Sequence, residues 1–190
     1  MKPLTRIALS ILLAASVVSC SRDNRAETNE RAGGSGAVGT TGASVDRDFV
    51  VDMADGNRAE IELSKMAEER ATNPQVKDFA RMLVRDHTKA LADLREAAAA
   101  ANVQLSTANE ENRDQRNLQE DLAKLSGHDF DRSYVGAMVD KHQNAVNEIE
   151  KKVDSDSPQI RQWATQTLPV VRKHLDHAKE LKETLDKAKT

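Results

Sequence analysis

Residues 74–101 read PQVKDFARMLVRDHTKALADLREAAAAA, and this stretch decides the fold. Apolar side chains recur in it at spacings of three and four, which is the period of an amphipathic helix, at Val76, Ala80, Leu83, Leu91, Leu94 and Ala98. Asn73 and Pro74 form a typical helix start, because asparagine caps the first turn and proline fits its first position. The stretch therefore predicts one long helix with a single apolar stripe, and His87 lies within that stripe.

The same period recurs along the rest of the chain, and no strand-like alternation interrupts it. It predicts further helices over residues 46–72, 107–126, 129–153 and 158–187. Their boundaries are marked by Ser157-Pro158, by a capping box of Thr107 and Glu110, by Gly127 as a helix end and by Asp129 as a cap. Pro169 should kink the last helix. The sequence thus predicts an all-α, antiparallel four-helix bundle over residues 45–190, with 107–126 as an additional short peripheral helix.

The first residues, MKPLTRIALSILLAASVVSC, have the form of a lipoprotein signal peptide. Lys2 and Arg6 precede an apolar run that is shorter than the roughly 20 residues of a membrane-spanning helix. The run ends at a small residue followed by Cys20, the only cysteine of the chain. We therefore expect removal of residues 1–19, lipidation of Cys20 and anchoring to the bacterial cell envelope. Ser21 in place of aspartate favours the outer membrane, facing the periplasm.

Residues 20–44 are expected to form a flexible tether, because they lack an apolar period and are rich in glycine from Gly33 onward. Residues 1–20 contain two basic side chains and no acid, so removal of the signal would change the formal net charge from −3 to −5. A slightly acidic chain with one Trp and one Tyr lacks both the basic stripe and the stacking platform of a nucleic-acid binder. Nucleic acid is therefore excluded as a partner, and the expected partner is the membrane, through Cys20.

Each of the four long helices places one ionisable residue on its apolar stripe, namely Glu60, His87, His142 and His174. Charged groups are seldom buried unless they are paired or bound to metal. Glu60 and His87 lie 13 and 14 residues from the turn near Asn73, so both lie roughly 20 Å from it and face each other.

Two interpretations of this cluster remain open. In the first, the three imidazoles and one carboxylate hold a single metal ion, for which zinc, copper or iron is better suited than calcium or magnesium. In the second, they form a hydrogen-bonded polar network without metal. Asp86, Tyr134 and Asp131 are weaker candidates for positions that support the cluster.

Four segments of the chain resemble the domain-of-unknown-function family 4142. They are AEIELSKMA (59–67), VKDFARMLVRDHTKA (76–90), FDRSYVGAMVDKH (130–142) and LPVVRKHLDHA (168–178). The resemblance covers nearly all of residues 46–185 and implies a ferritin-like bundle in a bacterial envelope lipoprotein, without an established activity. That family usually has aspartate directly before the third-segment histidine, where this chain has Lys141 and places Asp140 one residue earlier.

The cluster differs from the di-iron sites of ferritin-like enzymes, which use four carboxylates and paired Glu-x-x-His motifs. No histidine of this chain has glutamate three residues before it. A di-iron enzyme is therefore not expected, and no catalytic residue is assigned. Three functions remain: a non-catalytic metal-binding envelope lipoprotein, an interaction or stress-protection module without metal, and a mononuclear metalloenzyme. The first is favoured.

Overall fold

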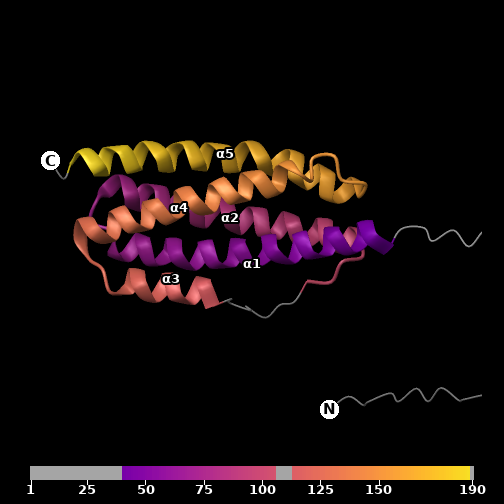
Figure 1. The fold of residues 1–190 in the computed structure, drawn as a ribbon, viewed down its shortest axis with the longest axis horizontal. Helices are drawn as coiled ribbons and strands as arrows, with labels where there is room; N and C mark the ends of the chain where they lie inside the picture. The colour runs from indigo at the N-terminus through magenta and orange to yellow at the C-terminus, as the bar shows by residue number, and fades with distance from the viewer. Residues whose placement is uncertain (1–39, 106–112, 189–190) are drawn as a thin grey trace, which may run out of the picture. The chain divides into compact units, whose positions relative to one another are not determined.

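The computed structural model describes residues 40–105 and 113–188, with side chains from Asp46 onward. Every regular element in these ranges is a helix (Figure 1). The five helices are α1 (Thr40–Arg70), α2 (Pro74–Ala100), α3 (Arg113–Ala123), α4 (Gly127–Glu150) and α5 (Pro158–Lys187).

The four long helices form an antiparallel bundle built from two hairpins (Figure 1). Helix α1 packs against α2 and α4 against α5, while contacts between α2 and α5 and between α1 and α4 close the ring. The shorter α3 lies outside this ring, and its buried Leu122 packs against the core. The predicted all-α four-helix bundle with a short peripheral helix is confirmed.

The helix boundaries follow the predicted capping chemistry in two places. Asn73 Oδ1 accepts a hydrogen bond from the backbone N–H of Gln75 at 2.8 Å, and Ser157 Oγ accepts one from Ile160 at 3.4 Å. Each cap is followed by a proline in the first turn, as the sequence predicted.

Other boundaries differ from the prediction. Helix α1 begins at Thr40, within the segment expected to be tether, because extending a formed helix costs far less than starting one. Gly127 opens α4 and does not close α3, and its φ of +58° is a left-handed conformation that glycine adopts readily. Ser126, and not Asp129, occupies the N-cap position of α4. The predicted capping box at Thr107 and Glu110 lies outside the described residues.

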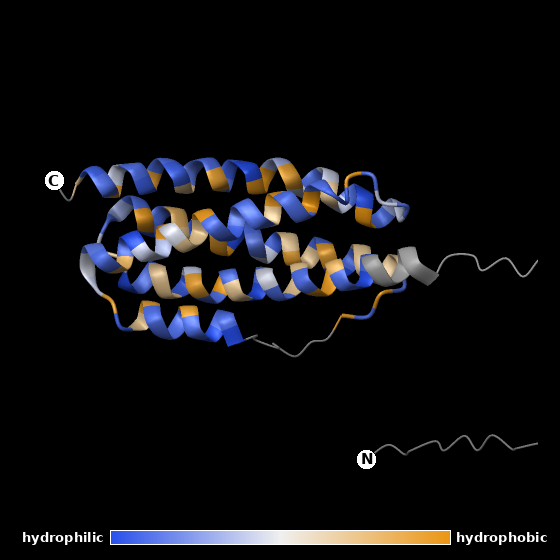
Figure 2. Cartoon of the chain, in the orientation of Figure 1, coloured by the Kyte–Doolittle hydropathy of each residue, from blue (hydrophilic) through white to orange (hydrophobic). Residues whose placement is uncertain are grey.

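The core is divided into two apolar halves. One half contains Phe79, Leu83, Phe130 and Met138, and the other contains Leu94, Ile149, Ile160 and Trp163. Figure 2 shows hydrophobic residues recurring along each long helix between hydrophilic ones. The level between the two halves is occupied by polar side chains, so the bundle contains a buried polar layer.

Asp131, near the start of α4, forms hydrogen bonds with the turn between α1 and α2. The side chain is 1% exposed. Its carboxylate accepts hydrogen bonds from the backbone N–H groups of Thr72 and Asn73, at 3.0 and 2.8 Å, and from the Thr72 hydroxyl at 2.7 Å. Asp131 therefore has a structural role at one end of the bundle.

Replacing Asp131 with alanine should lower the free energy of unfolding by about 3 kcal/mol, because several hydrogen bonds to a charged acceptor are lost at once. Asp129→Ala, at an exposed position in the same helical turn, is the matched control and should change stability by less than about 0.5 kcal/mol. Urea unfolding of the two variants measures the difference. Equal stabilities would show that the contacts of Asp131 contribute nothing.

The signal peptide, the lipidation of Cys20 and most of the tether were predicted for residues that the structure does not describe. The signal peptide at 1–19, Cys20 and the tether as far as residue 39 all lie outside the described residues. Among the helices of the described ranges, none combines the length and the apolarity needed to cross a bilayer.

Candidate metal centre

The polar layer receives one side chain from each long helix: Glu60 from α1, His87 from α2, His142 from α4 and His174 from α5. Each has apolar neighbours one turn away on its own helix, so the helical period turns all four toward the bundle axis. All four are buried, and His142 is fully enclosed. The four residues that the sequence singled out therefore lie at one level of the bundle.

The distances within the layer are short. Nε2 of His87 lies 3.0 Å from Oε2 of Glu60 and 3.4 Å from Nε2 of His142, and the latter nitrogen lies 3.6 Å from the same carboxylate oxygen. The centroids of the three imidazole rings lie 5.4 Å from one another. One nitrogen from each ring forms a triangle whose atoms all lie within 4.8 Å.

Hydrogen bonds around the layer orient two of the imidazoles. Nδ1 of His142 lies 2.8 Å from the carbonyl oxygen of Met138, and a carbonyl can only accept. Asn57 donates its amide to the carbonyl of Met53 at 2.7 Å, which leaves its side-chain oxygen 2.9 Å from Nδ1 of His87. Both rings therefore donate through Nδ1, and in the neutral ring the Nε2 lone pair faces the layer.

The third imidazole, His174, is oriented by a carboxylate. Its Nε2 lies 3.1 Å from Oδ2 of Asp86, and its Nδ1 is buried without a hydrogen-bond partner. Asp86 also contacts Arg85, with Nε 3.0 Å from Oδ1. An imidazole that donates to a carboxylate through one nitrogen and presents the other is the usual arrangement of a histidine bound to metal.

Electrostatics keep two of the imidazoles uncharged. Burial, with the charges of His87 and His142, lowers the pKa of His174 to about 4. Burial also lowers the pKa of His142, although the Glu60 carboxylate acts in the opposite direction. Burial alone would raise the pKa of Glu60, but the charged forms of His142 and His87, a hydrogen bond from His87 and the charge of Lys141 together outweigh it and lower the pKa.

Among the described residues, Nδ1 of His174 is buried without a hydrogen-bond partner, and the only close polar neighbours of the buried Oε2 of Glu60 are ring nitrogens of His87 and His142, at 3.0 and 3.6 Å. Buried polar atoms in proteins are nearly always paired, so each unpaired one requires an explanation. A cation between the three rings would satisfy both atoms. The donor set of three imidazole nitrogens next to a carboxylate fits a transition metal such as zinc, copper or iron.

A cavity of about 220 Å³ adjoins the layer and is lined by Glu60, His87 and His174. Its walls are mainly apolar, with Met53, Ile149 and Trp163 among them. The lining also includes exposed residues, Asn144, Glu148 and Val170, so the cavity reaches the surface.

Residues 33–181 match the sequence profile of a family described as a domain of unknown function, DUF4142. The chain belongs to this family. No match to a curated protein was found.

Two solved structures share the fold of this DUF4142 domain. A crystal structure of a DUF305 fragment from Deinococcus radiodurans superposes with a TM-score of 0.63 at 15% identity, covering 75% of this chain and 95% of that one. CopM in its Cu(II)-bound form superposes with a TM-score of 0.58 at 18% identity, covering 73% of this chain and 96% of that one. At these identities the likeness concerns the fold alone, and it agrees with the ferritin-like helical bundle expected from the sequence.

Of the three supporting positions considered in the DUF4142 chain, the structure places only Asp86 in contact with the layer. Tyr134 exchanges a hydrogen bond with Ser64 at 2.9 Å, and burial, with Glu60 and Glu68 nearby, raises its pKa. Asp131 belongs to the turn at the end of the bundle. Neither Tyr134 nor Asp131 is hydrogen-bonded to a residue of the cluster. Tyr134 pairs with Ser64 on α1, and Asp131 pairs with Thr72 and Asn73 in the turn between α1 and α2.

Asn57, which orients His87, is not among the site residues predicted from the sequence. Its position three residues before Glu60 is a usable signal, since residues at that spacing share a helix face. Two further ionisable residues close to the cluster in sequence do not join it: Asp140 is exposed, and His177 packs edge-on against the ring of Phe79 with centroids 5.0 Å apart.

Proposed function

We propose that this DUF4142 protein binds one transition-metal ion in its buried polar layer, held by His87, His142 and His174 with the Glu60 carboxylate beside it. The observation that carries the proposal is the convergence of three imidazole nitrogens within 4.8 Å of one another beside the Glu60 carboxylate, with Nδ1 of His174 unpaired. Such an arrangement costs free energy without a cation and gains it with one.

Copper and zinc are the first ions to test. Imidazole nitrogen suits both, and Cu(II) generally binds a given nitrogen site most tightly among divalent first-row metals. CopM, which shares the fold, has been solved with Cu(II) bound. The likeness to CopM concerns the fold, and it supports only the choice of Cu(II) as one of the first ions to test.

The test is metal analysis of protein produced without an affinity tag, combined with thermal unfolding. Stoichiometric metal after gel filtration, and a melting temperature that rises with added Cu(II) or Zn(II), would support the proposal, because an ion that binds only the folded state stabilises it. If no metal is retained and the melting temperature does not change, the layer is a polar network that fixes helix register.

We further propose that the domain works at the envelope membrane as a lipoprotein, with Cys20 lipidated and the bundle on the periplasmic side of the outer membrane. The support is the sequence around Cys20. Cys20→Ala should abolish incorporation of labelled fatty acid into the protein and leave the leader uncleaved, whereas Ser21→Ala should do neither. Equal labelling of the Cys20→Ala variant and the wild type would contradict lipidation at this residue.

The contact between Asp86 and His174 gives a prediction that separates metal binding from a polar network. Asp86→Asn should weaken metal binding about 10- to 100-fold, because the carboxylate that orients the imidazole and raises its basicity is lost. Asp93→Asn is the matched control, since this partly exposed aspartate lies two turns further along α2 and pairs with Lys89. Competition titration with a chelator measures both affinities. Equal affinities would exclude a supporting role for Asp86.

A further inference from the structure

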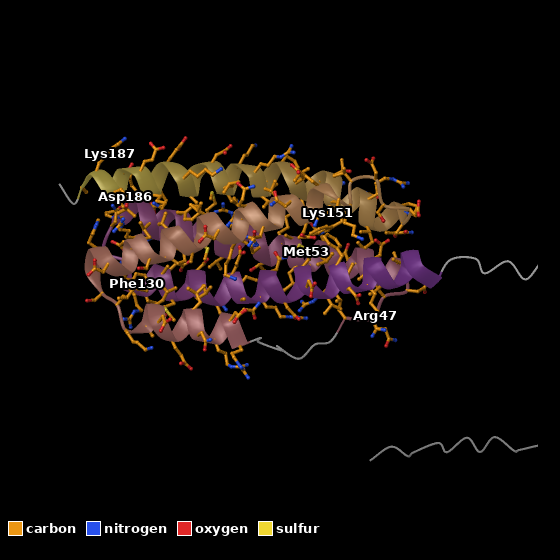
Figure 3. All side chains as sticks on the ribbon, viewed as in Figure 1. Arg47, Met53, Phe130, Lys151, Asp186 and Lys187 are labelled. Atoms are coloured by element: carbon orange, nitrogen blue, oxygen red, sulfur yellow. The ribbon has the colours of Figure 1, made fainter. Side chains whose placement is uncertain are left out.

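The cavity beside the polar layer meets only one side of the candidate metal centre. Three of the four cluster residues line it, whereas His142 does not and is fully enclosed. Met53, labelled in Figure 3, is on α1 in the wall of this cavity, whereas Phe130 lies at the start of α4 in the other apolar half. A metal ion held by the three rings would therefore have protein behind it and the cavity in front of it.

The geometry of the donors leaves one coordination position open, if the proposed metal binding is accepted. The three imidazole nitrogens lie within 4.8 Å of one another and supply three ligands, and Oε2 of Glu60 lies beside them, 3.0 Å from Nε2 of His87. Sites with three protein ligands keep a further position for an exchangeable molecule, whereas closed structural sites use four. With Nε2 of His87 bound to the metal, Oε2 of Glu60 is left to accept a hydrogen bond from whatever fills that position.

The cavity selects for a molecule with an apolar body. Its walls are formed mainly by apolar side chains, including Met53, Ala90, Ile149, Trp163 and Val171. The indole of Trp163 is held in place by a hydrogen bond from Nε1 to the carbonyl of Ala90 at 3.2 Å. A volume of about 220 Å³ exceeds the roughly 150 Å³ of a cavity that accepts benzene. A single small ring therefore fits.

The charges around the cavity favour a neutral molecule. Glu60 and Lys141 both line it, and their opposite charges offset each other. The carboxylates of Asp86 and Glu148 are already paired, with Arg85 at 3.0 Å and Lys151 at 2.6 Å. An organic cation would thus find little free negative charge at the rim.

We infer that the cavity is a ligand site, in which a small neutral molecule with a flat apolar body places one nitrogen donor on the metal held by His87, His142 and His174. This inference rests on the proposed metal binding. It adds that the ion is accessible, so the protein senses or captures an organic ligand through its metal and does not merely store the ion.

Gly56 allows the cavity to be filled without altering any metal ligand. It lines the cavity on α1, and a Cβ added there would meet nothing within 4 Å. The Cβ of Gly56→Leu therefore meets no neighbouring atom at a residue that lines the cavity, and leucine is the better helix former. Gly136→Leu is the matched control, because Gly136 is also helical with open space at its Cβ but does not line the cavity.

A second variant blocks the mouth from outside. Val170 lines the cavity and is 40% exposed, so Val170→Trp narrows the opening without repacking the core. It keeps the inference testable if the leucine at position 56 disturbs the packing between helices.

The experiment uses protein loaded with Co(II), whose visible spectrum reports coordination, and imidazole as the probe. Metal content is measured first, and an absence of bound Co(II), Cu(II) and Zn(II) would overturn the proposed function and this inference with it. With metal retained, imidazole should change the spectra of wild type and Gly136→Leu in a saturable way. Gly56→Leu and Val170→Trp should keep the metal and bind imidazole at least tenfold more weakly.

Two results would overturn the inference while leaving the metal centre intact. One is a metal-loaded wild type whose spectrum does not respond to imidazole. The other is equal imidazole affinity in wild type and in both cavity variants, which would show that the probe reaches the metal by another route.

Discussion

Replacing His142 or His87 with alanine should lower metal affinity by about 100- to 1000-fold. A structural zinc site gains about 10–16 kcal/mol from four ligands, so one ligand corresponds to roughly 3 kcal/mol, which is more than a hundredfold in the dissociation constant. His142 should show the larger loss, because it is fully enclosed and no water can replace its nitrogen from the cavity side.

His177→Ala is the matched control for this series. His177 lies one turn from His174 on α5 and packs against Phe79, away from the layer. Chelator competition gives the affinities, and cooperative urea unfolding of each metal-free variant verifies that it is folded. Metal affinities equal to wild type in folded His142→Ala and His87→Ala would rule out the layer as the binding site.

Acidification should destabilise the metal-free protein by about 3 kcal/mol or more between pH 7 and pH 4. The imidazole of His174 takes up a proton near pH 6.5 in the unfolded chain but only near pH 4 in the folded one, a difference that corresponds to about 3 kcal/mol. Between these values the unfolded state binds more protons, so acid favours unfolding. The stability contributed by the neutral ring is complete above pH 6.5 and is lost as the pH falls toward 4.

His142 and Glu60, which lie beside His174 in the layer, also make the folded state less stable in acid. The lowered pKa of His142 has the same sign, and the lowered pKa of Glu60 adds stability above pH 4.5 that is lost below it. Urea unfolding in the presence of a chelator, at pH 7, 6, 5 and 4, measures the combined effect.

His174→Gln isolates the contribution of one ring, because glutamine does not titrate. This variant should lose markedly less stability than wild type over the same pH range, whereas His177→Gln should follow wild type. A pH dependence that is unchanged in His174→Gln would show that the burial of this imidazole carries no stability cost.

Much of the bundle could be predicted because helical periodicity is a local property. The spacing of apolar residues around His87 and His142 placed both rings on the inner faces of their helices, and the caps at Asn73 and Ser157 placed two helix starts correctly. The start of α1 at Thr40 was missed, since threonine and glycine there lower the intrinsic helix propensity.

The sequence predicted which residues form the candidate site, but not the hydrogen bonds that these and neighbouring residues make. Counting residues from the turn at Asn73 brought Glu60 and His87 to one level, and the 3.0 Å contact between them agrees with that count. The role of Asp131 was not accessible in this way, because its partners at Thr72 and Asn73 lie nearly 60 residues away along the chain.

The sequence by itself determined an all-helical bundle, its inward faces and the four ionisable residues on them, because a 3.6-residue period assigns each side chain to a face of its own helix. Only the tertiary structure decided which nitrogen of each ring faces the layer, that Asp86 and Asn57 orient two of the rings, and that a cavity opens beside the metal centre. These features depend on hydrogen-bond partners and empty space supplied by other helices, and no local pattern records them.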